Sequence, residues 1–153
     1  MNIGDIVPDL LGQDAEGREV KLSDFPGKKV ILYFYPKDNT SGCTAEACSM
    51  RDNLPALEHE GYQVIGVSVD SADSHKKFAA KNELTFPLIA DTDHRLVEQM
   101  GVWGEKSMYG RKYMGTFRTT FIIGPDHKIE KIYLPKQIKT KTHATQILDA
   151  VGK

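Results

Sequence analysis

Several features that would assign a protein to a class at first sight are scarce in this sequence. Its 153 residues include two cysteines and one tryptophan, and 20 Lys and Arg residues oppose 21 Asp and Glu residues. Two cysteines are too few for a disulfide scaffold or a zinc finger. The formal net charge is −1, whereas a general nucleic-acid binder has an excess of basic residues. We therefore expect no structural metal and no nucleic-acid partner.

Long apolar segments are also lacking. The longest apolar run, residues 30–35, has six residues, whereas a membrane-spanning helix needs about 20. Residues 1–5 contain neither the basic nor the apolar region of a secretory signal. We therefore expect no membrane association and a cytoplasmic location. The small number of apolar stretches favours a monomer.

Apolar runs separated by turn residues predict the elements of an α/β fold. Runs of β-branched and aromatic residues are typical of strands buried on both faces. Strands are expected at residues 30–35, 64–69 and 86–89, and hairpins over residues 10–22 and 119–134. Helices are expected over residues 43–60, with a break at Pro55, and over residues 73–82, 94–100 and 142–151. This order predicts an α/β sandwich with a mixed sheet, and no linker or repeat divides residues 1–153 into more than one domain.

Cys43 lies where a predicted strand, a polar loop and a predicted helix N-terminus meet. The first turn of a helix leaves backbone N–H groups unpaired and carries about half a positive charge. A thiolate is stabilised at such a position, and the thiolate is the nucleophilic form of cysteine. Cys43 is therefore expected to be a reactive thiol, with a small buried core residue as the alternative.

Cys48 follows Cys43 by five positions. On a continuous helix, residues with this spacing have Cα atoms about 8–9 Å apart, which exceeds the limit of roughly 7 Å for a disulfide. The two sulfurs can bridge only if the first turns of the helix unwind. The spacing therefore permits a redox switch, and an ordinary apolar role for Cys48 stays open.

Other residues with chemical potential have plainer interpretations. The histidines lack the spacing of a metal site, and each is expected at the surface: His59, His75, His94, His127 and His143. No histidine lies near Cys43 in the sequence to act as the base of a hydrolase. The Gly-rich residues 101–115 are expected to form a long loop near the site.

Four blocks of sequence carry a specific resemblance. Residues 36–43 read Pro-Lys-Asp-Asn-Thr-Ser-Gly-Cys, a P-x-x-x-T-x-x-C motif, and Thr-Ala-Glu-Ala-Cys continues it to Cys48. Gly-Val-Trp-Gly-Glu-Lys at residues 101–106 and Arg-Thr-Thr-Phe at residues 118–121 follow in the same order. Together these blocks resemble the Q-type, or bacterioferritin-comigratory, peroxiredoxins over nearly the whole chain. Ser41 and Thr119 stand where many relatives carry proline and serine.

The resemblance implies a thioredoxin-like sandwich, in which a central mixed sheet is flanked by helices and preceded by an N-terminal β-hairpin extension. It also implies a thiol peroxidase that reduces hydrogen peroxide or organic hydroperoxides and needs no cofactor and no metal. Cys43 is the implied peroxidatic cysteine, which becomes a sulfenic acid. Cys48 is the implied resolving cysteine, and the resulting disulfide is recycled by a thioredoxin-like dithiol protein.

Four further residues acquire roles from the same resemblance. Thr40 is implied to hydrogen-bond the thiolate and the peroxide, and Arg118 to stabilise both with its planar donor fork. Pro36 is implied to wall the pocket, and Glu46 to orient the arginine. Each also has a plainer interpretation, as a helix cap for Thr40, a surface ion pair for Arg118 and a complement to the helix dipole for Glu46.

Two other functions remain as alternatives at this point. One is a thioredoxin-fold disulfide reductase, although such enzymes place their cysteines within one helical turn. The other is a redox-sensing binding module in which Cys43 only signals. The spacing from Cys43 to Cys48 and the threonine before Cys43 favour the peroxidase over the reductase.

Overall fold

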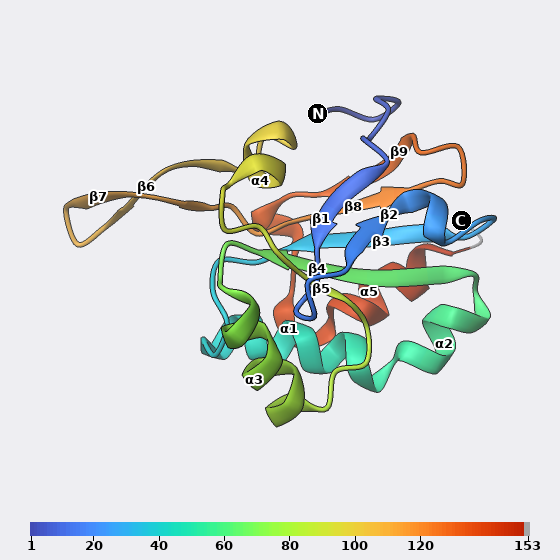
Figure 1. Cartoon of the computed structure of the whole chain (residues 1–153), viewed down its shortest axis with the longest axis horizontal. Coiled ribbons are helices and arrows are strands. Elements are labelled where there is room, and N and C mark those ends of the chain that lie inside the picture. Colours follow the sequence, from blue (N-terminus) through green and yellow to red (C-terminus); the bar gives the residue numbers. More distant parts are fainter. Residues whose placement is uncertain (152–153) are drawn as a thin grey trace.

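The computed structural model describes residues 1–151, and a five-stranded mixed sheet forms its centre (Figure 1). The strands lie in the order β5–β4–β3–β8–β9. Their bounds are β3 Lys29–Phe34, β4 Tyr62–Ser68, β5 Leu88–Ala90, β8 Thr119–Ile123 and β9 Ile129–Tyr133. Strands β3, β4 and β5 run parallel to one another, while β8 pairs antiparallel with β3 and with β9. This arrangement confirms the predicted mixed sheet.

Helices cover one face of the sheet, and a smaller layer covers the other (Figure 1). The helical layer consists of α1 Ser41–Asp52, α2 Leu54–His59, α3 Ala72–Asn82 and α5 His143–Ala150. The second layer contains α4 Arg95–Gln99 and the hairpin of β1 Leu10–Gln13 and β2 Glu19–Lys21. Along β3 the side chains alternate between the layers, because Ile31 and Tyr33 pack against the helices and Leu32 and Phe34 against the hairpin side.

Most element boundaries agree with the expectations to within a few residues. The expected break in the residue 43–60 helix occurs at Asn53, and Pro55 lies in the first turn of α2, where a missing N–H removes no helical hydrogen bond. Three short 3₁₀ turns complete the chain, at Leu22–Asp24, Pro135–Gln137 and Thr140–Thr142. Within the described part of the chain, no helix is both long and apolar enough to cross a membrane.

The expectation of a long loop at residues 101–115 is wrong, because this stretch forms a hairpin. Strand β6, Trp103–Met108, pairs antiparallel with β7, Arg111–Thr116, and the hairpin projects away from the body (Figure 1). Its two turn residues, Tyr109 and Gly110, have φ angles of 52° and 77°, as a tight type I′ connection requires. Most of the side chains on these strands are exposed or half-buried, so the hairpin has no alternating apolar pattern that would reveal it.

The expectation that every histidine lies at the surface is also wrong for two of them. His75 on α3 and His143 at the start of α5 are both 0% exposed. His75 contacts Asp38 and the Ile89 carbonyl, and His143 contacts the Thr120 hydroxyl. These polar partners, supplied by distant parts of the chain, offset the cost of burying an imidazole.

Candidate active site

The loop after β3 leads directly into the helix that carries both cysteines. Thr40 has extended backbone angles and precedes α1, and its carbonyl accepts the first helical hydrogen bond, from Thr44 N. Cys43 is therefore the third residue of α1, and it is only 1% exposed. Its position agrees with the expected helix N-terminus, where unpaired N–H groups favour an anion.

Arg118 reaches this helix from the part of the sheet where β8 pairs with β3. It lies just before β8, whose first residue, Thr119, pairs with Phe34 at the end of β3. Arg118 Nη2 lies 3.2 Å from Cys43 Sγ, and Nη1 donates to Glu46 Oε1 at 2.6 Å. Cys43 and Glu46 are three residues apart and share one face of α1, so a single guanidinium bridges both.

Burial determines the electrostatics of this trio. The Glu46 side chain is fully buried, and burial raises its pKa to about 7, although the charge and the hydrogen bond of Arg118 act in the opposite direction. Burial disfavours the charged form of Arg118, yet Glu46 and Cys43 together raise its pKa. Arg118 therefore remains a fixed cation between two acidic groups.

The remaining expected site residues make no hydrogen bond to the trio within the described chain. Pro36 is half-buried and Thr40 exposed, and the Thr40 hydroxyl donates to the Lys37 carbonyl at 2.8 Å. Cys48 is half-buried in the C-terminal half of α1, and its sulfur lies 3.9 Å from Asn82 Oδ1 at the end of α3. Both cysteines are free thiols on one continuous helix. The structure thus brings Cys43, Glu46 and Arg118 into direct contact and holds Cys48 apart from them.

Comparison with known proteins places this geometry in a family. The model of the AhpC/TSA family matches residues 3–132. The chain is 43% identical to peroxiredoxin Bcp of Escherichia coli K12, covering 97% of this chain and 94% of that protein, and 41% identical to peroxiredoxin Bcp of Bacillus subtilis, covering 99% and 95%. The chain belongs to the peroxiredoxins of the AhpC/TSA family. It is accordingly a thiol peroxidase, an enzyme that acts on peroxides.

Solved structures support the same assignment for the fold of this peroxiredoxin. A cysteine-to-serine mutant of Xylella fastidiosa PrxQ superposes with a TM-score of 0.87 at 40% identity, covering 97% of this chain and 94% of that one. The bacterioferritin comigratory protein of Xanthomonas campestris, described for its alkyl peroxide reduction activity, gives 0.83 at 33% identity, with 95% and 96% covered. The thioredoxin-like fold with a central mixed sheet is therefore confirmed.

The peroxiredoxin also contains site residues that the sequence did not indicate. Lys106 on β6 donates from Nζ to the Thr116 carbonyl at 2.6 Å, and burial, followed by the nearby charge of Arg118, lowers its pKa. Lys106 belongs to the block of residues 101–106 that resembles the family, and this block is the sequence feature that could have indicated it. Asp38, His75 and His143 carried no local signal, since their burial depends on distant partners.

Asp38, Asp70 and His75 are the one group within residues 1–151 whose spacing could suit a metal ion, with their ligand atoms within 4.8 Å of one another. The donor chemistry argues against that use. The Asp38 carboxylate accepts from the Tyr35 hydroxyl, the Ser74 hydroxyl and His75 Nδ1. His75 Nε2 lies 2.9 Å from a backbone carbonyl, which can only accept, so this nitrogen donates its hydrogen there and has no lone pair for a cation. The cluster is a closed hydrogen-bond network that fixes the loop before Thr40.

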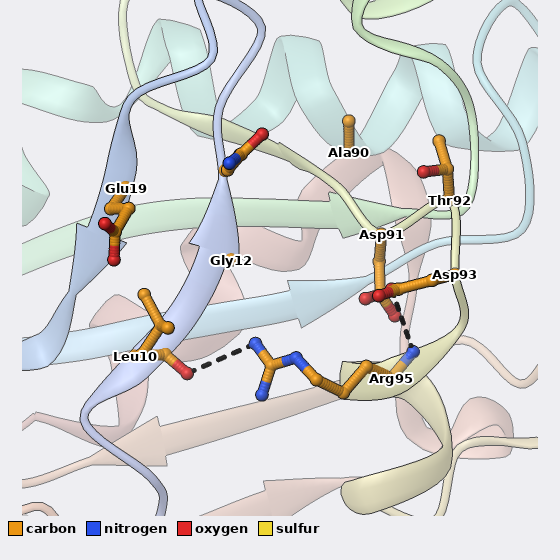
Figure 2. Close-up of a pocket in the computed structure, with 9 residues that line it drawn as sticks. Leu10, Gly12, Glu19, Ala90, Asp91, Thr92, Asp93 and Arg95 are labelled. Carbon is orange, nitrogen blue, oxygen red and sulfur yellow. Dashed lines mark hydrogen bonds between the residues drawn. The ribbon is translucent and has the colours of Figure 1, made fainter.

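A separate hollow of about 330 Å³ lies between β1, the end of β5 and α4 (Figure 2). Arg95 crosses it and donates to the Leu10 and Leu11 carbonyls. Asp91 accepts from two backbone N–H groups of α4. None of the nine residues that line it, all in the described part of the chain, is a cysteine or histidine. Its charged groups therefore support local structure, and the hollow is distinct from the cysteine site.

Proposed function

We propose that Cys43 is the peroxidatic cysteine of this enzyme and that Arg118 activates it. The observation that carries the proposal is the contact of one guanidinium with both Cys43 Sγ, at 3.2 Å, and Glu46 Oε1, at 2.6 Å. A cation in contact with the sulfur favours the thiolate. Glu46 accepts from the other arm of Arg118 and thereby sets the direction in which the guanidinium points.

The chemistry at Cys43 follows from this arrangement. The thiolate attacks the terminal oxygen of a hydroperoxide, so an S–O bond forms as the O–O bond breaks. Sulfur is oxidised to a sulfenic acid, and the leaving oxygen takes a proton and departs as water or an alcohol. Negative charge moves from sulfur to oxygen along this path, and the planar donor fork of Arg118 can follow it.

Thr40 and Pro36 complete the proposed pocket. The Thr40 hydroxyl lies on the loop that enters α1 and donates to the Lys37 carbonyl. A hydroxyl donates one hydrogen and accepts through two lone pairs, so in this position Thr40 accepts from the peroxide O–H, and it donates to the thiolate after rotating away from Lys37. Pro36 brings an apolar ring without an N–H donor to the same loop, which limits water around the thiolate.

Cys48 is the proposed resolving residue, and its reaction requires α1 to open. The thiol of Cys48 attacks the Cys43 sulfenic acid, forming an S–S bond and releasing water. The helical spacing of about 8–9 Å between the two Cα atoms forbids this bond while α1 is intact. Conversion of Cys43 to a neutral sulfenic acid weakens its contact with Arg118, which is an anchor of the first turns.

The reductant and the assembly complete the proposal. A dithiol protein of the thioredoxin class attacks the Cys43–Cys48 disulfide through a mixed disulfide and leaves both cysteines reduced. The half-exposed position of Cys48 in the folded helix supports access from outside. We propose a monomer acting in the cytoplasm, on the basis of the composition of the sequence.

Intact mass after oxidation tests both cysteine roles together. Reduced protein is mixed with one equivalent of hydrogen peroxide and quenched rapidly. We expect the wild type to lose two hydrogens, because an intrachain disulfide forms. Cys48→Ser should gain one oxygen and stop, because the sulfenic acid has no thiol partner, and Cys43→Ser should keep its mass and lose peroxide turnover.

Three results would contradict parts of this assignment. Rapid turnover by Cys43→Ser would reject Cys43 as the peroxidatic residue. A gain of oxygen without bridging in the wild type would keep Cys43 and reject Cys48 as its resolver. A wild-type mass that does not change on this timescale would show a thiol of ordinary reactivity. Insulin reduction by the same protein serves as the control for disulfide-reductase activity.

A further inference from the structure

Glu46 has an incomplete set of hydrogen bonds. Its Oε1 accepts from Arg118, whereas Oε2 is buried and has no hydrogen-bond partner within residues 1–151. A buried carboxylate oxygen without a donor destabilises the ionised form. His143 Nε2 lies 4.0 Å from this free oxygen, and both side chains are fully buried. A second titratable group therefore faces Glu46 on the side opposite Arg118.

The partners of His143 fix which ring nitrogen carries hydrogen. Nδ1 lies 2.9 Å from Gln146 Oε1. The Gln146 amide is itself oriented, because its oxygen also accepts from a backbone N–H and its nitrogen donates to a backbone carbonyl. Since Gln146 presents an acceptor, Nδ1 is the donor. In the neutral ring Nε2 then has one lone pair, which accepts from the Thr120 hydroxyl at 2.8 Å, and the free oxygen of Glu46 lies 4.0 Å from the same nitrogen.

Charge counting shows where one more proton belongs. With Cys43 as a thiolate, the site holds two anions, Cys43 and Glu46, and one cation, Arg118. An uncompensated charge is unfavourable in a buried site, and one added proton makes the group neutral. Burial raises the pKa of Glu46 to about 7 and lowers the pKa of His143. The proton therefore resides on Glu46, and the Nε2 lone pair of His143 is the acceptor that faces it.

We propose that His143 is a positioning residue of the peroxide site: its Nε2 accepts the proton held by the free oxygen of Glu46, so that neutral Glu46 leaves the charge of Arg118 to the Cys43 thiolate. The inference rests on the proposed role of Cys43. Closing the gap to a hydrogen bond requires the two groups to approach by about 1 Å and the Thr120 hydroxyl to rotate its hydrogen away from Nε2. In the full step, thiolate, neutral Glu46 and hydroperoxide give sulfenic acid, carboxylate and alcohol, so the protons balance.

Other ionisable groups face this pair from the neighbouring elements. Tyr33 on β3 acts on Glu46 and Cys43, and burial raises its pKa well above the usual value, so it stays neutral. The ring of Tyr133 on β9 lies edge-on to His143 at 5.2 Å. Lys106 on β6 acts on Arg118 and Cys43. All of these groups are retained in the comparisons below, so they do not change between variants.

The test is a double-mutant cycle read by ultraviolet thiolate absorbance, in a Cys48→Ser background and between about pH 5 and pH 9, below the tyrosine titration. His143→Phe removes the lone pair and keeps a ring beside Tyr133, so Glu46 ionises more readily and competes for Arg118. We expect the thiolate-to-thiol ratio of Cys43 at neutral pH to fall by roughly 3- to 10-fold. In a Glu46→Gln background, His143→Phe should have no effect on that ratio. His59→Phe, at an exposed position on α2, is the matched control and should leave the ratio unchanged.

A purely structural role for His143 predicts a different result. An equal fall in both backgrounds, or no fall in either, would overturn the proposal. His143→Gln offers an amide oxygen in place of the Nε2 lone pair, so the ratio should fall less in this variant than in His143→Phe. NMR of the wild type needs no variant: the ring signals of His143 must shift at the midpoint of the Glu46 titration, and ring signals that do not respond to that step would reject the coupling. Absorbance detects the thiolate without peroxide, so slow peroxide reduction would reject the proposed function and leave this coupling measurable.

Discussion

The protein contains two buried histidine–carboxylate pairs, and they are built in opposite ways. Asp38 Oδ2 lies 2.7 Å from His75 Nδ1, and the Tyr35 and Ser74 hydroxyls also donate to that carboxylate. Glu46 Oε2 lies 4.0 Å from His143 Nε2 and lacks any hydrogen-bond partner within the described chain. The first, closed pair has its hydrogen bonds satisfied, whereas the second, open pair has a carboxylate oxygen without a donor, on the residue that shares Arg118 with Cys43.

The difference shows that the number of donors, and not burial alone, decides whether a buried acid stays ionised. Burial acts to raise the pKa of Asp38, but the donated hydrogen bonds and His75 outweigh it, so the pKa is lowered. Glu46 receives a single donor, and burial prevails. His75 is held through both ring nitrogens, which lie 2.7 Å from the Asp38 carboxylate and 2.9 Å from the Ile89 carbonyl. The closed pair anchors a loop, and the open pair leaves one oxygen of Glu46 without a donor.

Breaking the closed pair should have the largest effect on stability. Asp38→Ala leaves the buried His75 ring, the buried Tyr35 hydroxyl and the half-buried Ser74 hydroxyl without their carboxylate partner. We expect the free energy of unfolding to fall by about 3–5 kcal/mol, measured by urea denaturation of the reduced protein. Asp52→Ala removes the exposed carboxylate of the Arg51–Asp52 pair and serves as the control, with an expected loss of under about 1 kcal/mol. Equal losses in the two variants would show that the pair at Asp38 is not the anchor.

Removing the acid of the open pair should change how stability depends on pH. Because the pKa of Glu46 is raised from 4.5 to about 7, the folded state binds an extra proton in that window, and stability falls as pH rises through it. Glu46→Gln should abolish this fall, so the difference in unfolding free energy between variant and wild type should change by up to about 3 kcal/mol across the window. A difference that stays constant with pH would contradict a raised pKa.

The acid limb of the stability curve should show the opposite sign and the smallest effect. The pKa of Asp38 is lowered from 3.8, so its contribution is complete above the unfolded value and is lost as pH falls through the folded one. Denaturation curves of wild type and Asp38→Asn should therefore converge on acidification below pH 3.8. Curves that remain parallel in acid would indicate that Asp38 is not ionised in the folded protein.

Sequence reasoning predicted the parts of the structure that depend on local chemistry. The central strands follow from continuous apolar runs, and the break near Pro55 follows from the proline ring. The helical spacing of Cys43 and Cys48 was confirmed because both lie on α1. The contact of Arg118 with Cys43 and Glu46 could be expected only through the family motif, since these residues are brought together by strand pairing.

The features that sequence reasoning missed depend on distant partners. The β6–β7 hairpin pairs two strands with few buried side chains, so no apolar alternation marks it. His75 and His143 are buried because Ile89 and Thr120 supply partners from other elements. An isolated histidine in a sequence gives no indication of such partners. The carboxylate oxygen without a donor near Cys43 therefore results from tertiary packing and could not be predicted from the local sequence.

The unequal anchoring of α1 has a consequence for how much oxidant the enzyme tolerates. Its C-terminal half is tied to α5 by Ala144 N donating to Ser49 Oγ, and to α3 by Arg51 donating to the Asn82 carbonyl, while Arg118 contacts Cys43 and Glu46 in its first turns. On the proposed mechanism, a sulfenic acid at Cys43 waits for these first turns to open, and during that wait a second peroxide can convert it irreversibly to sulfinic acid. On this mechanism, the rate at which the first turns open determines how long the enzyme stays active under oxidant stress.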